Sequence, residues 1–279
     1  MLTITSDNYY SKDADKEYMS VSQFKDFVGS QEHYGCEAAA MGKIDGSFEP
    51  QVTTPLLVGS YIDAYFEGTV DQFKDEHPEL VCKTGAQKGQ LKADYRQADE
   101  IIKRIESDKL FSAYMAGEKQ TIMTGDLFGT KWKIKMDSYH PNDKIVDLKI
   151  MQNIEPVWSD RNKRKVDFIH YWGYDLQGAI YQKIVEQNTG KKLPFYIAVA
   201  TKEKPGANIE IIEVSQPQLD AALSFIETNM PRVLAVKNRR MKPHRCGKCA
   251  YCLETKVLEA PIKIEDIMLI KEETFEDFA

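Results

Sequence analysis

The sequence lacks the features that mark membrane-spanning, secreted and repetitive proteins. In its 279 residues, no apolar run reaches the roughly 18 residues that a transmembrane helix needs. The first residues, MLTITSDNYYSKDADKEY, contain no basic stretch followed by an apolar one, so they do not resemble a secretory signal. Internal repeats, low-complexity tracts and obvious linkers are also missing. These absences lead us to expect a cytoplasmic protein that folds as one domain over 1–279.

Positive charge is not in excess, because the formal net charge is -6. A net acidic chain is not typical of a protein that coats nucleic acid nonspecifically, although it is compatible with a local basic groove. Two basic clusters occur, RNKRK at 161–165 and KNRRMKPHR at 237–245. Each cluster alone is typical of a solvated loop, so its meaning depends on where the active site lies.

Cysteine is scarce, and the odd number of five argues against a disulfide framework. The five residues are Cys36, Cys82, Cys246, Cys249 and Cys252. Three of them lie in RCGKCAYC, with two residues between neighbours. Such a run, completed by a fourth ligand from elsewhere, is typical of iron–sulfur ligation, whereas local zinc sites usually combine two separated pairs. A zinc site with His244 as fourth ligand and a set of free thiols remain open. Cys82 has no assigned role.

The order of predicted elements indicates an α/β protein. Helical periodicity and capping residues predict two helices within 20–42, separated by a turn near Gly35, and further helices over 54–67 (with Thr54 as N-cap), 91–108, 171–188 and 216–236. Alternating patterns and turn residues predict a three-stranded antiparallel meander over 119–150, a buried strand at 193–202 and its hairpin partner at 208–214. We therefore expect a mixed central sheet flanked by helices.

A carboxylate and an ammonium group share one face of a predicted strand, KIVDLKI at 144–150. Asp147 and Lys149 point the same way because side chains alternate along a strand. A tight hairpin would bring Asp137, on the preceding strand, close to Asp147. Two carboxylates repel each other unless a cation lies between them, and carboxylate oxygens suit Mg²⁺ or Mn²⁺. An ordinary salt bridge on a solvated face is the alternative reading of Asp147 and Lys149.

Asp137, nine intervening residues and DLK resemble the core motif of the PD-(D/E)XK nuclease superfamily. The whole chain is similar to its RecE/RecB-like branch, in particular to the exodeoxyribonuclease VIII-like phage proteins. GSYIDAYFEG at 59–68 resembles the early helix of that branch, with Glu67 matching and Asp63 in place of a metal-binding His. GYDLQGAIY at 173–181 matches its Q-x-x-x-Y helix through Gln177 and Tyr181. The resemblance implies a restriction-endonuclease-like core over about 54–236.

The cysteines extend this resemblance. The RecB-like branch includes nucleases in which one early and three late cysteines hold a [4Fe–4S] cluster. Cys36 stands where the early ligand would be, and the late group lies in the predicted Cys-rich segment at 237–256. The resemblance therefore implies that the N-terminal helices and this segment pack together, ahead of an acidic tail at 257–279.

The resemblance implies a Mg²⁺- or Mn²⁺-dependent DNA exonuclease of phage or prophage origin in a bacterial cytoplasm. It would resect double-stranded ends in the 5′ to 3′ direction during homologous recombination, with a single-strand annealing protein as partner. The predicted catalytic set is Asp137, Asp147, Lys149, Glu67, Gln177 and Tyr181. The predicted metal-binding set is Asp63, Asp137, Asp147 and Leu148, and the predicted cluster ligands are Cys36, Cys246, Cys249 and Cys252. The candidate phosphate contacts are Lys163, Arg164, Lys165, Arg239 and Arg240.

Two other functions remain open. One is a nuclease that prefers single strands, like the CRISPR adaptation nucleases that share the cluster. The other is a DNA-binding protein that keeps the fold without catalysis, which Asp63 in place of His would favour. Related exonucleases form ring-shaped oligomers around DNA, so a homo-oligomer is also open. No residue of this sequence establishes one.

Overall fold

The computed structural model of the protein describes residues 2–258 and 260–264. Its helices are α1 (Lys12–Glu17), α2 (Val21–Val28), α3 (Glu37–Asp45), α4 (Thr54–Glu67), α5 (Val70–Glu76), η1 (Pro78–Leu80), α6 (Ala93–Glu106), α7 (Lys109–Tyr114), α8 (Phe168–Trp172), α9 (Tyr174–Thr189), α10 (Gln216–Lys237) and α11 (Ala250–Glu254). Its strands are β1 (Thr121–Leu127), β2 (Thr130–Met136), β3 (Ser138–His140), β4 (Lys144–Met151), β5 (Val157–Ser159), β6 (Arg164–Val166), β7 (Phe195–Thr201) and β8 (Ile209–Val214). Most of the predicted acidic tail lies outside the described residues.

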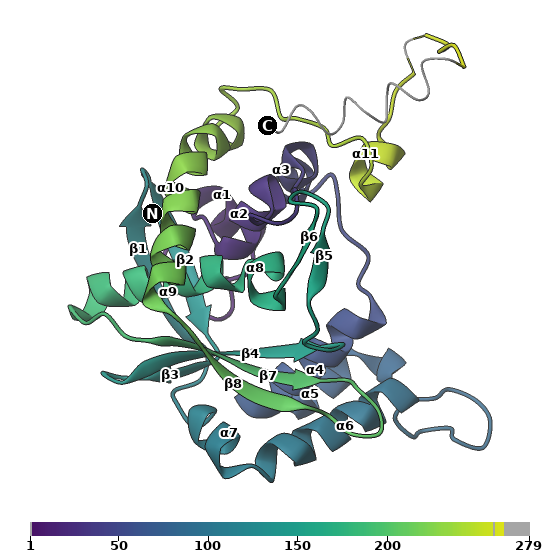
Figure 1. Ribbon diagram of the computed structural model, residues 1–279. Coiled ribbons are helices and arrows are strands. Elements are labelled where there is room, and N and C mark those ends of the chain that lie inside the picture. Colours follow the sequence, from purple (N-terminus) through teal and green to yellow (C-terminus); the bar gives the residue numbers. More distant parts are fainter. Residues whose placement is uncertain (1, 259, 265–279) are drawn as a thin grey trace.

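The central sheet has four strands in the order β3-β4-β7-β8. β4 and β7 are parallel, whereas β3 and β8 pair antiparallel with their neighbours, so the sheet is mixed as expected. Figure 1 shows α9 and α10 on one side of this sheet and α4 to α7 on the other. Both faces of β4 and β7 are therefore covered, which explains why both strands are nearly continuous apolar runs.

Side chains of β4 alternate between the two cores. Ile145 packs in the core that contains α9 and α10, whereas Val146 and Leu148 pack in the core that contains α4 and α6. Asp147 and Lys149 therefore interrupt the face that Ile145 shares, as the alternation predicts. The polar pair occupies a place where an apolar residue would ordinarily pack.

The predicted three-stranded meander over 119–150 is wrong in its connectivity. β1 and β2 form a separate two-stranded sheet, and the chain leaves it after Met136 to enter the central sheet at Ser138. The buried hydroxyl of Ser138 donates to the carbonyl of Tyr114 (2.8 Å) and accepts from the amide of Gly117 (2.9 Å). These contacts anchor the chain beside the end of α7, so Asp137 lies at the switch between the two sheets.

The other predicted elements agree with the structure apart from small differences at their ends. The predicted helix over 54–67 is α4, with Thr53 rather than Thr54 as its N-cap. β7 and β8 form the predicted antiparallel hairpin, and the last long helix is α10. Within the described residues, no helix has both the length and the apolar character that crossing a membrane requires.

Candidate functional site

The short strand β3 leaves part of β4 without a partner on one edge. Its pairing with β4 ends at Ser138 opposite Val146, so Asp137 comes next to Asp147 along the same edge. The amide of Leu148 donates to Oδ2 of Asp137 at 2.9 Å. A strand residue directs its N–H and C=O to the same side, so the Leu148 carbonyl also faces the Asp137 side. Two carboxylates and one backbone carbonyl are thereby directed to one place.

Asp147 is almost completely buried, with 1% of its surface exposed. The side-chain amide of Gln177, on α9, donates to its Oδ1 at 2.5 Å. The ammonium group of Lys149 is in ion-pair contact with Oδ2, and within the described residues no other donor meets this buried oxygen. A buried oxygen with an unused lone pair is the kind of group that a metal ion satisfies.

Burial and neighbouring charges shift the titration of this cluster. Burial raises the pKa of Asp137 well above its usual range, and the charges of Asp147 and Asp63 raise it further. Burial opposes the charged form of Lys149, but the carboxylates of Asp147 and Asp137 outweigh it and raise its pKa. Lys149 therefore remains an ammonium at neutral pH, and it faces Asp137, an acid that ionises with difficulty.

Helix α4 brings two further acids to the same place. Asp63 and Glu67 are four residues apart and so share one helical face. Both line a small cavity of about 10 Å³ together with Asp137 and Leu148, which is roughly the room of one water molecule. Burial raises the pKa of Asp63 to about 7, the charge of Lys149 lowers it, and the charges of Asp147 and Glu67 raise it.

Gln120 also lines this cavity, and sequence reasoning missed it. Its Oε1 is buried and has no hydrogen-bond partner, and its backbone has a positive φ of 52°. Non-glycine residues rarely adopt a positive φ, and those that do are often found at functional sites. No motif in the sequence pointed to Gln120, because the junction before β1 meets the acids only through the fold.

The second residue of the predicted Q-x-x-x-Y pair has a structural contact. The hydroxyl of Tyr181, a residue that is 8% exposed, donates to the backbone carbonyl of Lys135 on β2 at 3.0 Å. Gln177 reaches Asp147 from the same face of α9. The pair thus ties α9 to the acidic cluster and to the strand that leads into Asp137.

Asp63 and Glu67 also line a larger cleft of about 610 Å³, which shares these two residues and Gln120 with the small cavity at Asp137. Residues from the N-terminal segment, α4, α5, β2 and the chain before β1 line it, and these are Ser6, Asp7, Tyr10, Ser60, Asp63, Ala64, Glu67, Thr69, Gln72, Phe73, Glu76, Lys119, Gln120 and Lys135. Lys119 and Lys135 give this acidic cleft a basic wall. Sequence reasoning missed both lysines and Tyr10. Lys119 and Tyr10 are far from the motifs along the chain, and Lys135, two residues before Asp137, stands in a strand pattern that gave it no role.

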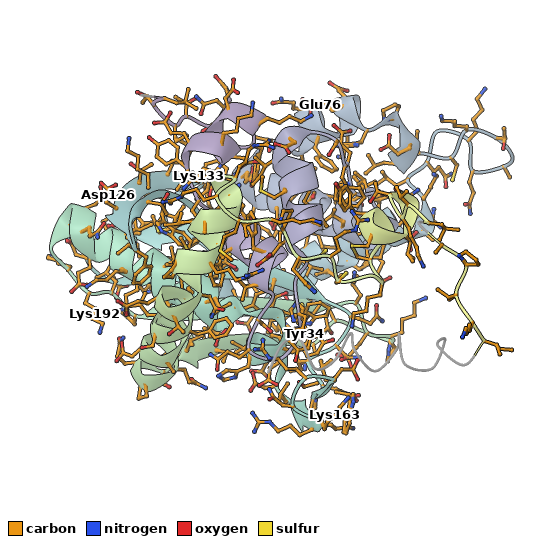
Figure 2. All side chains as sticks on the ribbon, turned by 90° about the horizontal axis from the view of Figure 1, so that it is seen from above. Tyr34, Glu76, Asp126, Lys133, Lys163 and Lys192 are labelled. Carbon is orange, nitrogen blue, oxygen red and sulfur yellow. The ribbon has the colours of Figure 1, made fainter. Side chains whose placement is uncertain are left out.

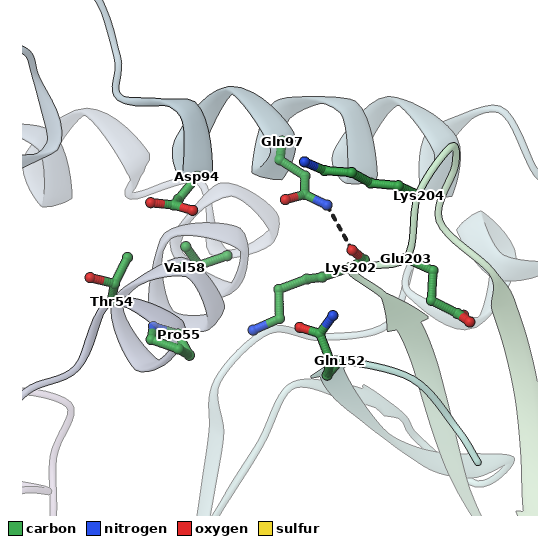
Figure 3. A pocket seen from close by; sticks show the side chains of 9 residues that line it. All are labelled: Thr54, Pro55, Val58, Asp94, Gln97, Gln152, Lys202, Glu203 and Lys204. Atoms are coloured by element: carbon green, nitrogen blue, oxygen red, sulfur yellow. Dashed lines mark hydrogen bonds between the residues drawn. The ribbon is translucent and has the colours of Figure 1, made fainter.

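A second cavity, of about 660 Å³, lies at the other end of α4 (Figure 3). Thr54, Pro55 and Val58 contribute one wall, and Lys202 and Lys204 come from the turn after β7. Figure 3 shows the hydrogen bond from the Gln97 side chain to the Lys202 carbonyl, which measures 2.8 Å. The residues of the acidic cluster do not line this cavity, so we place the chemistry in the cleft at Asp63.

The predicted phosphate contacts lie in two other places. Lys163, Arg164 and Lys165 are exposed on the β5–β6 hairpin, and Figure 2 shows Lys163 at the edge of the molecule. Arg164 pairs with Glu32 at 3.3 Å. Arg239 and Arg240 follow α10, where Arg239 pairs with Asp45 at 2.6 Å. Neither group is among the residues that line the acidic cleft.

The four predicted cluster cysteines come together. The Sγ atoms of Cys36, Cys246, Cys249 and Cys252 all lie within 4.8 Å of one another. Burial raises the pKa of the Cys36 thiol to about 12, whereas for Cys246 backbone N–H groups outweigh burial and lower the pKa to about 7. His244 is not in this group, and its backbone contacts Glu37 and Ala38 instead. Within the described residues, no three acidic groups gather as closely.

The residue types fit a metal at both places. Mg²⁺ is commonly held by one or two carboxylates, with water completing the shell, and Asp137, Asp147 and the Leu148 carbonyl offer such a set. Four thiols fit zinc or an iron–sulfur centre. The two sites differ in chemistry, because the first opens into a cleft and the second is enclosed by α3, α11 and the segment before α11.

Comparisons with known proteins agree with this geometry. Residues 20–255 match the family described as "PDDEXK-like domain of unknown function (DUF3799)". A crystal structure of a "Putative exonuclease" from Eubacterium rectale is 53% identical, with a TM-score of 0.91 over 96% of this chain and 98% of that chain. Another solved structure, described as SSO0001, is 13% identical over 81% of this chain and 96% of that chain, and its TM-score of 0.30 carries no argument. No curated protein matches the chain. The family match spans most of the sequence and both acidic motifs, so the chain belongs to the PDDEXK-like family, whose fold is that of nucleases.

Proposed function

We propose that the protein is a Mg²⁺-dependent deoxyribonuclease that degrades DNA from double-stranded ends. The observation that supports it most is the buried carboxylate of Asp147, which Gln177 and Lys149 hold beside Asp137 and the Leu148 carbonyl. The 53% identical relative is described as a "Putative exonuclease", which also supports attack at an end. Mn²⁺ would serve in place of Mg²⁺, because both prefer oxygen ligands.

In this proposal the acids bind the metal ion and Lys149 contacts the phosphate. Asp137, Asp147 and the Leu148 carbonyl would hold the ion, with Asp63 and Glu67 facing it from α4. When bound, the ion polarises the phosphodiester and lowers the pKa of a coordinated water. Lys149, with its raised pKa, donates a hydrogen bond to the phosphate and stabilises the charge that develops there. Its proposed role is therefore to stabilise this charge and to orient the attacking water.

Gln177 and Tyr181 act in this proposal as positioning residues. Gln177 fixes the carboxylate of Asp147, leaving Oδ2 turned toward the ion. Tyr181 holds the β2 backbone at Lys135, two residues before Asp137. Through these contacts they orient the groups that meet the DNA near the scissile bond. Lys163, Arg164, Lys165, Arg239 and Arg240 remain candidates for contacts to more distant phosphates.

The biological setting follows from the resemblance to phage exodeoxyribonucleases. Digestion from the 5′ end leaves a 3′ single strand, which a single-strand annealing protein would coat during homologous recombination. The site of action in this proposal is the cytoplasm of a bacterial host that carries a phage or prophage.

For the cysteines we propose a structural metal centre. A [4Fe–4S] cluster places each thiolate on a separate iron, whereas one zinc ion at about 2.3 Å from four thiolates holds them roughly 4 Å apart. The spread of 4.8 Å among the four sulfurs is therefore closer to the single-ion case. Iron, sulfide and zinc analysis of anaerobically purified protein, with a visible spectrum, distinguishes the two. A brown protein with four irons per chain would overturn the single-ion proposal.

A digestion assay tests the nuclease proposal. End-labelled linear duplex, circular duplex and single-stranded DNA are incubated with the protein, with and without Mg²⁺. We expect loss of linear duplex only with Mg²⁺, sparing of the circle, and no loss with Lys149→Ala, whose folding is checked by thermal melting. Preference for single strands would favour the CRISPR-adaptation-like function. A gel shift without cleavage by the wild-type protein would favour an inactive DNA-binding protein.

A further inference from the structure

Tyr10 is an exposed aromatic residue at the rim of the acidic cleft. Its side chain is 74% exposed, yet it lines the same cleft as Asp63 and Glu67. Single exposed apolar residues are common on proteins and need no explanation by themselves. Tyr10 differs from such residues because its segment is anchored to β2 and because a lysine ammonium lies over its ring.

The turn that carries Tyr10 is anchored to β2. The hydroxyl of Tyr9 donates to the backbone carbonyl of Lys133 at 3.4 Å, and the buried ammonium of Lys133 donates back to the carbonyl of Tyr9. Lys133 also pairs with Asp15 at 2.7 Å. The rings of Tyr9 and Tyr10 meet edge to face, with centroids 5.0 Å apart. Stacking of a ligand on Tyr10 would therefore cost little conformational entropy, because this segment is already held in place.

A cation links the Tyr10 ring to the acids. The Nζ atom of Lys135 lies 4.6 Å from the ring centroid of Tyr10, and its charge acts on Asp63. Lys119 lines the same cleft. An aromatic face beside the Lys135 ammonium matches a nucleotide, which presents a flat base next to a phosphate.

We propose that Tyr10 is a stacking subsite for an unpaired nucleobase of the DNA substrate, with Lys135 and Lys119 on the adjoining phosphate. This deepens the proposed function, on which it rests, by naming the substrate in the cleft as a strand end separated from its complement. Stacking on an aromatic ring tolerates any base, so the subsite selects unpaired nucleotides and not a sequence.

Binding measured without catalysis tests this subsite. The probe is a short single-stranded oligonucleotide with 2-aminopurine at its 5′ end, titrated with the Lys149→Ala protein in Mg²⁺. We expect quenching of the fluorophore on binding. Adding Tyr10→Ala should relieve the quenching and weaken binding by roughly 5- to 100-fold, whereas Tyr10→Phe keeps the ring and both signals. Trp158→Ala is the matched control, because Trp158 is 51% exposed on β5 and does not line the cleft.

The outcomes separate this proposal from the proposed function. Equal binding and quenching with and without the Tyr10 ring, or no binding of the oligonucleotide at all, would overturn the subsite. A wild-type protein that cleaves no DNA but shows ring-dependent quenching would retain the subsite and remove the nuclease proposal. Cleavage by a protein whose binding ignores Tyr10 would do the reverse.

Discussion

The contacts of Asp147 are more typical of a metal-binding acid than of an acid in an ordinary surface salt bridge. An ordinary exposed pair contributes little to stability, but here the acid is buried and held from α9 as well as by Lys149. Its partner Gln177 is neutral, so the amide fixes the carboxylate without cancelling its charge. The acid remains available to a cation.

Removing that amide should weaken the site. We expect Gln177→Ala to lower kcat/KM on linear duplex by roughly 10- to 100-fold, because a hydrogen bond to a charged group contributes about 1.5–3 kcal/mol. Steady-state digestion at several Mg²⁺ concentrations measures it. Gln187→Ala is the control, because Gln187 lies on the same helix and its side chain donates to the Asp126 carbonyl in β1, away from the acids. An equal loss in both variants would mean damage to α9 and no role for Gln177.

Asp63 should make the metal-free protein sensitive to pH. Its pKa is raised from 3.8 to about 7, so the folded state binds the proton more tightly than the unfolded chain does. This group therefore reduces stability progressively as pH rises from about 4 to about 7, and the full cost persists above that. We expect Asp63→Asn to stabilise the metal-free protein at pH 8 by roughly 2–4 kcal/mol, and by far less at pH 4.

Denaturant unfolding at the two pH values measures this difference. Saturating Mg²⁺ should shrink the gain at pH 8, because the ion offsets the cost of the ionised acid. Asp75→Asn, at an exposed position on α5, should change stability at neither pH. A gain that is equal at pH 4 and pH 8 would contradict the titration account.

Some site residues could be predicted from the sequence because they lie in short motifs. Asp147 and Lys149 interrupt an apolar strand, and Asp63 and Glu67 interrupt an apolar helix, where unpaired charges are costly. Gln120, Lys119, Lys135 and Tyr10 carry no such signal. They reach the cleft only through the packing of the N-terminal segment and the β1–β2 hairpin against α4.

At the scale of elements, the helices follow from periodicity, but the division into two sheets does not. Alternation over 119–150 gives strands without naming their partners, and the switch at Asp137 depends on the buried hydroxyl of Ser138. Parallel pairing of β4 with β7 joins residues about 50 positions apart. Local pattern carries no information on such pairing, whereas the resemblance to a family does.

The four cysteines bring α3 next to α11, so a metal bound to them would hold these two helices together. Cys36 is the N-cap of α3, and Cys252 lies in α11, with their Sγ atoms 3.5 Å apart. A metal bound there closes a loop of more than 200 residues, which constrains the unfolded chain. We expect Cys36→Ser to lose the metal and lower the Tm by roughly 5–15 °C.

Thermal melting combined with metal analysis measures this effect. Cys82→Ser is the control, because Cys82 lies outside the group of four. A full metal complement in Cys36→Ser, with an unchanged Tm, would contradict the proposed centre.

At the scale of the whole molecule, two cores meet at the central sheet, and the acidic cluster lies between them. α4 belongs to one core and α9 to the other, and β4 separates them while presenting Asp147 and Lys149 (Figure 1). Ser6, Asp7 and Tyr10 of the N-terminal segment line the cleft together with Asp63 and Glu67. In the proposed function, a DNA strand would reach the acids through this cleft while the sheet fixes their spacing.

The location of a bound Mn²⁺ ion tests the central claim most directly. Crystals soaked in Mn²⁺ and measured near the manganese edge would show the ion as an anomalous peak. The account predicts a peak within coordination distance, about 2.2 Å, of carboxylate oxygens from both Asp137 and Asp147 and of the Leu148 carbonyl. A peak held by other residues, or none in the acidic cleft at saturating Mn²⁺, would contradict it.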